Sequence, residues 1–197
     1  MIADVQPGGI FSPHNRYGVP KYAGIRMSKE EFLNWESDDN YVYEYTNGIL
    51  EPTTSMRQEE IPLFTNLENA FFSTQTFREG GRLRAEVDVW LTDERYRRPE
   101  VAYYSAEQLQ QIKRGERVVP SFVVEFGSVS DQEDVSMKKR HEYFDAGVQV
   151  VWWVFPIYKE VVVYTSPINM TGRHHNDVLS ASPVLPDFEL TVAELFA

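Results

Sequence analysis

The sequence predicts an α/β fold in which a central mixed β-sheet is flanked by helices. Two observations lead to this prediction. Segments with helix-like apolar spacing occur together with segments in which apolar and polar residues alternate, as in half-buried strands. Their order is a helix, strands, a helix, and then strands and helices mixed, which favours a sheet with helices on its faces. At 197 residues, of which 42% are hydrophobic, the chain can bury the core of one domain.

The N-terminal third contains an irregular segment followed by three regular elements. Residues 1–26 are rich in proline and glycine and lack periodicity, so we expect an extended arm there and a single domain over residues 27–197. Ser28 followed by Glu31 in MSKEEFLNW has the form of a capping box that opens a short helix. YVYEYTNGILEP alternates around Asn47-Gly48, a pair typical of hairpin turns. IPLFTNLENAFFSTQTF then has helix-like apolar spacing.

The remaining elements follow from alternation and caps. RLRAEVDVWL alternates strictly and predicts one half-buried strand, and RRPEVAYY predicts another. SAEQLQQIKRGE predicts a helix capped by Ser105 that ends near Gly115. FVVEF predicts a central strand, and the next helix closes at Gly147, with Ser128 and Ser130 as candidate caps. VQVVWWVF and KEVVVYTS predict two more strands. After the polar stretch TGRHHND, VLPDFELTVAELF predicts a last segment with a terminal helical turn.

The composition excludes several classes of site. The chain has no cysteine, which excludes disulfides, thiolate metal sites and a cysteine nucleophile. No apolar run approaches the 18 or so residues that span a bilayer, and no secretory signal is recognisable at the N-terminus. We therefore expect a cytoplasmic protein with no membrane partner.

The net charge of −11 is the reverse of what a protein that binds long duplexes usually carries. Its distribution is uneven, because basic residues gather in two places: Arg78, Arg82, Arg84, Arg95, Arg97 and Arg98, and then Lys138, Lys139 and Arg140. Two interpretations stay open. The arginines form a local basic surface, or they pair with acidic neighbours on a surface hairpin.

Three ionisable residues lie where burial is expected. Glu125 is central in FVVEF, and Glu100 begins the strand before it. On the following helix, Lys139 falls within an arc of about 80° that also holds Val135 and Tyr143. Two carboxylates, with a backbone carbonyl and waters, suit Mg²⁺, and an ammonium group nearby can orient water or offset phosphate charge. These residues could therefore build a metal-dependent phosphodiesterase, although composition and pattern alone favour the alternative. The alternative is a structural carboxylate pair neutralised by the lysine.

At these residues the chain resembles the Uma2 family of restriction endonucleases (the DUF820 group), within the PD-(D/E)XK nuclease superfamily. The resemblance runs from about Met27 to the C-terminus. It rests on MSKEEFLNW, YEYTNGILE, RRPEVAYY, PSFVVEFGSVS, KRHEYFDAGVQVVWWVFP and VLSASPVLPDFELTVAELF. The resemblance implies a restriction-endonuclease-like core, cleavage of DNA phosphodiester bonds with Mg²⁺ or Mn²⁺, and a homodimer.

Residue roles follow from the same resemblance. Glu100 and Glu125 would hold the metal, and Lys139 would be the catalytic lysine, displaced onto the helix because Gly127 stands where the usual lysine would be. Glu44 matches a recurring glutamate and is an additional candidate for the site. Its alternative interpretation is a surface strand residue.

The chain also departs from the family pattern. Pro99-Glu100 replaces Pro-Asp, and the stretch SMRQEEIP after Pro52 lacks the histidine that often leads the family's helix. Asp187 stands where glycine is common, which we interpret as a turn change. A positioning error of about 1 Å can cost a hundredfold in rate. The competing hypotheses are therefore a catalytically weak or inactive member that serves as a binding or dimerisation module, and a small-molecule hydrolase that uses its carboxylates as acid and base.

Two other pairs of residues are candidates for metal binding. Glu86 and Asp88 could supply a second metal site or a base, although pairing with arginines on the opposite strand is the more common role of such residues. His174 and His175 have no third ligand at a useful spacing, so we expect them to be exposed.

Overall fold

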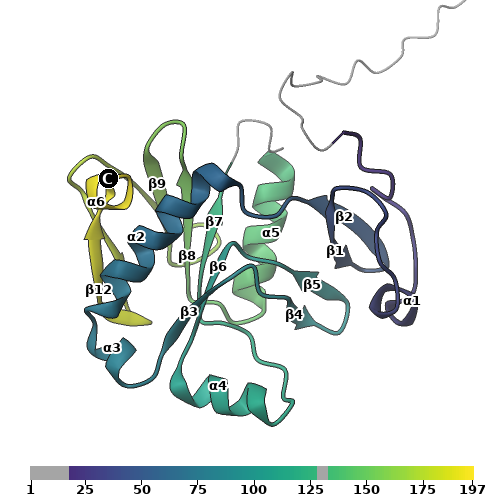
Figure 1. Ribbon diagram of the computed structural model, residues 1–197, viewed down its shortest axis with the longest axis horizontal. Coiled ribbons are helices and arrows are strands. Elements are labelled where there is room, and N and C mark those ends of the chain that lie inside the picture. The colour runs from purple at the N-terminus through teal and green to yellow at the C-terminus, as the bar shows by residue number, and fades with distance from the viewer. Residues whose placement is uncertain (1–17, 128–132) are drawn as a thin grey trace, which may run out of the picture.

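A six-stranded mixed sheet forms the centre of the computed structural model, which describes residues 18–127 and 133–197 (Figure 1). The strand order is β10-β9-β8-β7-β6-β3, and only β7 and β8 run parallel. This confirms the predicted α/β fold with a mixed sheet. The strands are β3 (Arg82–Ala85), β6 (Val101–Tyr104), β7 (Phe122–Phe126), β8 (Val150–Phe155), β9 (Glu160–Tyr164) and β10 (Met170–His174).

One face of the sheet is covered by helices α2 (Ile61–Phe72) and α6 (Val192–Leu195) and by the hairpin of β11 (Val178–Ala181) and β12 (Leu185–Thr191). They lie together on the left of Figure 1. Trp152 of β8 stacks on Phe188 of β12, with ring centroids 5.5 Å apart. Buried aromatic pairs of this kind anchor the hairpin to the sheet.

Helices α5 (Glu133–Asp145) and α4 (Ala106–Lys113) cover the opposite face. Helix α5 is the crossover that parallel strands β7 and β8 require, since a short turn cannot join them. Tyr143 of α5 is fully buried with Val123 and Trp153. Trp152 and Trp153 therefore serve opposite faces, as adjacent residues of a strand do.

A second, four-stranded antiparallel sheet lies beyond α5 (Figure 1). Its order is β2-β1-β5-β4, with β1 (Val42–Thr46), β2 (Ile49–Thr53), β4 (Val89–Thr92) and β5 (Arg95–Arg97). Asn47 and Gly48 have φ of 50° and 80° in the β1–β2 turn, which confirms the predicted hairpin. Helix α1 (Lys29–Leu33) begins at the predicted Ser28 capping box and packs Phe32 on Tyr45.

The described part of the N-terminal segment packs on this small sheet. Residues 21–24 form a turn, Arg26 makes a β-bridge to Ile49, and the Tyr22 ring lies 4.9 Å from that of Trp35. Residues 1–17 of the predicted arm, and the candidate caps Ser128 and Ser130, lie outside the described residues.

Two differences from the predicted elements concern strands. RLRAEVDVWL is not one strand, because β3 ends at Ala85 and β4 begins at Val89 in the other sheet. Glu86, at φ 49°, breaks the extended conformation between them, although the side-chain alternation continues through it. TGRHHND, for which the sequence predicts no element, contributes to β10. That strand lies at the sheet edge and is largely exposed, so it needs no apolar face.

The short elements η1 (Gln58–Glu60) and α3 (Gln75–Arg78) flank α2. Asp187 accepts hydrogen bonds from the backbone N–H groups of Gln75 and Thr76, at 2.7 and 3.1 Å, and so holds the first turn of α3. These hydrogen bonds give Asp187 a structural role, which is consistent with its interpretation as a turn change. Within the described residues, no helix is long and apolar enough to cross a membrane.

Candidate active site

The register of the central sheet brings Glu100 and Glu125 together. Strands β6 and β7 pair antiparallel with Val101 opposite Val124, so continuing the ladder by one residue places Glu100 opposite Glu125. Directly opposed residues of an antiparallel pair point to the same face. On the other side of Glu100, its carbonyl oxygen accepts a hydrogen bond of 3.1 Å from the Glu86 N–H. Glu86 directly after β3, Glu100 directly before β6 and Glu125 on β7 thus lie at one end of the sheet.

Lys139 reaches this end of the sheet from α5. Its ammonium nitrogen lies 3.0 Å from Glu44 Oε1 and 3.1 Å from Glu125 Oε1, and its side chain is 11% exposed. Burial alone would lower the pKa of Lys139, but the negative charges of Glu125 and Glu44 raise it above its usual range. The lysine is therefore a fixed cation between two carboxylates, which come from different sheets.

Glu125 is held from two directions. Its side chain is buried, and it accepts hydrogen bonds from the Tyr143 hydroxyl and from Lys139 Nζ. Burial raises the pKa of Glu125, while the Lys139 charge opposes this rise. Lys139 and Tyr143 are four residues apart on α5, so one face of that helix supplies both partners. Val135, predicted on the same stripe, is instead 49% exposed.

Glu100 has no such partners. Its Oε2 atom is buried and makes no hydrogen bond with the described residues. Burial, followed by the charges of Glu125, Glu60 and Glu86, raises the pKa of Glu100 to about 8. An orphaned carboxylate oxygen next to further carboxylates is a position that favours a divalent cation, because hard oxygen ligands and excess negative charge suit Mg²⁺ and Mn²⁺. The donor set at Glu100 and Glu125 therefore fits such an ion.

The described residues do not contain three or more His, Cys, Asp or Glu side chains gathered as a metal-binding group. The protein would thus supply Glu100 and Glu125, and the remaining ligands would come from water, backbone carbonyls or substrate. That division is usual for Mg²⁺, which keeps several waters and binds one or two carboxylates together with substrate phosphates.

Gly127 explains why the amine comes from the helix. A Cβ atom at this position would lie 2.7 Å from Phe155 Cε1 and 2.9 Å from Trp153 Nε1, closer than ordinary packing allows. The Gly127 N–H also donates a hydrogen bond to Val154 O at 2.7 Å, which ties this residue to β8. A lysine side chain two residues after Glu125 therefore has no room.

Behind Lys139, a buried arginine fixes Glu44. Arg97 is 1% exposed and donates to Glu44 Oε2 and to Glu142 Oε2, each at 2.8 Å, and also to Glu51. Glu44 Oε1 accepts a hydrogen bond of 2.8 Å from the Arg98 backbone N–H. Burial would raise the pKa of Glu44, but the charges of Lys139 and Arg97 lower it. The alternative interpretation of Glu44 as a surface residue is therefore wrong.

Three residues of this site are not predicted by the sequence: Arg97, Tyr143 as a partner of Glu125, and Glu60. Arg97 looked like one of six similar arginines, and the neighbours of Tyr143 are set by tertiary packing. Glu60 is 3% exposed, ends η1 and forms an ion pair with Arg57. Its position just before α2 was the available signal, because a charged residue at a helix entry can point inward.

Of the other candidate metal-binding residues, only Glu86 lies near the site. Glu86 accepts a hydrogen bond of 2.7 Å from the Met56 backbone N–H and lies close enough to Glu100 to raise its pKa. Asp88 forms an ion pair with Arg98 at 2.7 Å, which is the more common role named for it from the sequence. His174 and His175 are exposed, as predicted, at the end of β10, and β10 is the sheet edge opposite β3.

Comparisons with known proteins identify the family and the fold of the chain. The model of the Uma2 family, described as "Putative restriction endonuclease", matches residues 29–193. A similar fold occurs in the crystal structure of a protein from Anabaena variabilis described as "a putative nuclease belonging to DUF820". The two share 16% sequence identity and a TM-score of 0.71, over 86% of this chain and 97% of that one. No curated protein matches the chain.

Proposed function

The chain belongs to the Uma2 family, and from this premise we propose that it is a metal-dependent nuclease that hydrolyses DNA phosphodiester bonds. The observation that carries the proposal is the buried Glu100 Oε2 atom, which has no hydrogen-bond partner among the described residues and lies next to Glu125 and Lys139. A purely structural carboxylate in this position would be expected to have a donor. A ligand of a divalent cation would not need one in the metal-free protein.

Each residue has a distinct task in this proposal. Glu100 and Glu125 hold Mg²⁺ or Mn²⁺, which when bound supplies charge neutralisation at the phosphoryl oxygens and a lower pKa for bound water. Lys139 keeps its proton because two carboxylates raise its pKa, so it acts as a cation that orients water or offsets phosphate charge and not as a general base. Glu44 and Tyr143 are positioning residues, since they fix Lys139 and Glu125.

The second candidate is a catalytically inactive nuclease fold that serves as a binding or dimerisation module. The observation that favours it is the engagement of Lys139 by Glu44 and Glu125, which satisfies the lysine without a substrate. Glutamate at position 100 also carries its carboxylate one methylene further from the backbone than the aspartate of the family pattern. The homodimer and the division into an arm over residues 1–26 and a domain over 27–197 remain part of the proposal.

Calorimetric titration with Mn²⁺ tests the metal site first. The wild type should bind saturably, and Glu125→Gln should abolish binding. Glu189→Gln is the control, because Glu189 is exposed on β12, on the hairpin that covers the other face of the sheet. Cleavage of labelled DNA then tests the reaction. We expect Glu125→Gln and Lys139→Met to lose cleavage while their circular dichroism stays that of the wild type.

Two results would contradict the proposal. One is the absence of Mn²⁺ binding even when DNA is present to complete the coordination. The other is metal binding without cleavage of any duplex or single-stranded substrate, which would favour the inactive module.

A further inference from the structure

The six arginines that are close together in sequence divide into two groups in space. Arg95 forms an ion pair with Glu142, Arg97 forms ion pairs with three glutamates of which two are buried, and Arg98 forms one with Asp88. The other three, Arg78, Arg82 and Arg84, have no carboxylate within ion-pairing distance among the residues that the structure describes, and they bond only to carbonyl oxygens. In a chain with a net charge of −11, three neighbouring cations without acidic partners are unusual.

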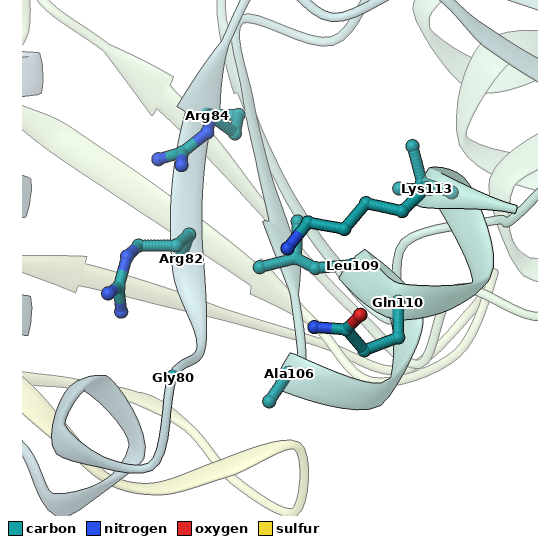
Figure 2. Close-up of a pocket in the computed structure, with 8 residues that line it drawn as sticks. Gly80, Arg82, Arg84, Ala106, Leu109, Gln110 and Lys113 are labelled. Carbon is teal, nitrogen blue, oxygen red and sulfur yellow. The ribbon is translucent and has the colours of Figure 1, made fainter.

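Two of these arginines line a pocket of about 420 Å³ between β3 and α4. Figure 2 shows Arg82 and Arg84 one after the other along β3, and Lys113 extending from α4 toward that strand. Leu109 and Gln110 lie on the α4 side of the pocket, and the guanidinium groups of Arg82 and Arg84 extend to the other side of β3, along its free edge. Arg84, Gln110 and Lys113 are exposed, and no acidic residue lines the pocket among the residues that the structure describes. The free edge of β3 and the adjoining pocket therefore both present hydrogen-bond donors and positive charge to solvent.

The hydrogen-bond donors of these arginines are mostly unused. Arg82 donates through Nη1 to Phe77 O and Gly81 O, and Arg84 donates through Nη1 to Leu83 O at 2.8 Å. A guanidinium group has five N–H donors in a planar fork. Those on Nε and Nη2 of both residues make no hydrogen bond within the described part of the chain. Such a fork matches the oxygens of a phosphate.

The pocket is aligned with the candidate active site. Strand β3 pairs with β6 so that Arg84 lies opposite Ala102 and Arg82 lies opposite Tyr104. Glu100 precedes Ala102 by two residues, so the arginines and Glu100 start from the same face of the sheet. Residues two apart along a strand are separated by about 6.6 Å. The pairs Arg82–Tyr104 and Arg84–Ala102 therefore lead along the sheet toward Glu100, which lies one such spacing beyond Ala102.

We infer that the pocket formed by Arg82, Arg84, Gln110 and Lys113 binds backbone phosphates of a nucleic acid whose scissile phosphate lies at Glu100 and Glu125. This inference rests on the proposed function. Binding at the pocket places the nucleic-acid backbone along the free edge of β3. This position determines which phosphodiester bond lies at the metal site. The pocket recognises the charge and spacing of the phosphates but not the base sequence, because phosphate contacts carry no base information.

The test is equilibrium binding of labelled duplex and single-stranded oligonucleotides. Binding is measured by fluorescence anisotropy, in EDTA, over a series of salt concentrations. The variant is Arg84→Gln/Lys113→Gln. Arg82 is left in place because its guanidinium group packs 4.5 Å from the Phe77 ring centroid and supports the fold. The matched control is Arg173→Gln/Lys159→Gln, which removes one arginine of β10 and one exposed lysine beside β9, away from the pocket.

We expect the pocket variant to bind about tenfold more weakly at low salt and the control to bind as the wild type does. The slope of log affinity against log salt should fall by about 1.8 for duplex or about 1.4 for a single strand, because each lost phosphate contact removes about 0.9 or 0.7. The form whose slope changes by its expected amount identifies the strand state that the pocket holds.

The inference is overturned if the pocket variant keeps the wild-type affinity and slope, if both variants weaken binding equally, or if the wild type binds neither oligonucleotide. These outcomes are separate from the metal site. Mn²⁺ titration of the pocket variant should match the wild type, and Glu125→Gln should still bind DNA in EDTA if only the metal site has failed.

Discussion

Glu100 and Glu125 are the same residue type on neighbouring strands, yet their surroundings differ. Glu125 receives hydrogen bonds from Lys139 and Tyr143, whereas the buried Oε2 of Glu100 receives none from the described residues. With a pKa of about 8, Glu100 is mostly protonated at neutral pH. Perturbed pKa values in a buried cluster are a common feature of active sites. Burial raises the pKa of both carboxyl groups, so the metal-free site carries less negative charge than two ionised glutamates would.

Metal binding is therefore expected to release a proton from Glu100. Below the pKa of about 8 the carboxyl group is protonated, and a cation must displace that proton, so Mn²⁺ affinity should rise with pH until about pH 8. Calorimetric titrations at neutral pH in two buffers with different ionisation enthalpies measure the release directly. The Glu100→Gln variant, which cannot ionise, should show no buffer dependence in any residual heat.

The same group predicts how the stability of the metal-free protein depends on pH. The pKa of Glu100 is raised from 4.5 when the chain is unfolded to about 8 when it is folded. Its contribution to stability is therefore complete below pH 4.5 and is lost as pH rises through 8. Urea midpoints should fall across this window in the wild type and less steeply in Glu100→Gln. Equal slopes would mean that Glu100 ionises normally.

At the scale of elements, the position of Lys139 depends on the packing of β8. Trp153 and Phe155 occupy the space above Gly127, so β7 cannot carry the amine two residues after Glu125. Helix α5 supplies it instead, because the crossover from β7 to β8 passes over the same face. One helix thereby fixes both Lys139 and Tyr143 against Glu125.

Gly127→Ala should destabilise the protein by about 1–3 kcal/mol, since the added methyl group must displace the Phe155 and Trp153 rings. Gly172→Ala in β10 is the control. A Cβ there meets nothing within 4 Å, and the change should stay within about 0.5 kcal/mol. Urea unfolding measures both. Moreover, Gly127→Lys should not restore cleavage to Lys139→Met, and a restored activity would show that β7 can carry the lysine after all.

Local signals predicted most elements because their causes are local. The capping boxes at Ser28 and Ser105 and the Asn47-Gly48 turn act over three or four residues, and all three form as predicted. The division of RLRAEVDVWL between two sheets could not be predicted in this way. The alternation of apolar residues runs unbroken through Glu86, and only tertiary packing reveals the left-handed residue at which the chain changes sheets.

The sequence predicts which residues form the candidate site, but it does not predict how they contact one another. Glu100, Glu125 and Lys139 were named from strand position, helix periodicity and family resemblance, and the structure brings them to one end of the sheet. That Lys139 would also bond to Glu44 depends on how the small sheet packs against α5. No pattern within a single segment contains that information.

At the scale of the whole molecule, Arg97 connects the two sheets. It lies on β5 and bonds to Glu44 of β1, Glu51 of β2 and Glu142 of α5, while Glu44 continues to Lys139. The small sheet is therefore more than an appended layer, since it positions Lys139 through a buried network of charges. Networks of this kind are costly to break one partner at a time, because the remaining charges stay buried without compensation.

Arg97→Met tests this connection. The change removes the shared cation from three carboxylates, two of them buried, and should lower the free energy of unfolding by about 3–5 kcal/mol. Arg98→Met is the control, because Arg98 pairs with the half-exposed Asp88 and its loss should cost at most about 1 kcal/mol. Urea unfolding followed by both tryptophan fluorescence and circular dichroism provides the comparison. Similar losses in the two variants would deny Arg97 its central role.

The acid side of the pH profile gives an independent readout of the same network. The charges of Arg97 and its lysine neighbours oppose the effect of burial and lower the pKa values of Glu44 and Glu51 below 4.5. Carboxylates with lowered pKa contribute stability above pH 4.5 that is lost as pH falls through their folded-state values. Wild-type stability should therefore decline on acidification for this reason and, separately, toward pH 8 because of Glu100. In Arg97→Met the acid decline should be shallower while the decline toward pH 8 persists. If both declines changed together, the network and the metal site would be one electrostatic unit.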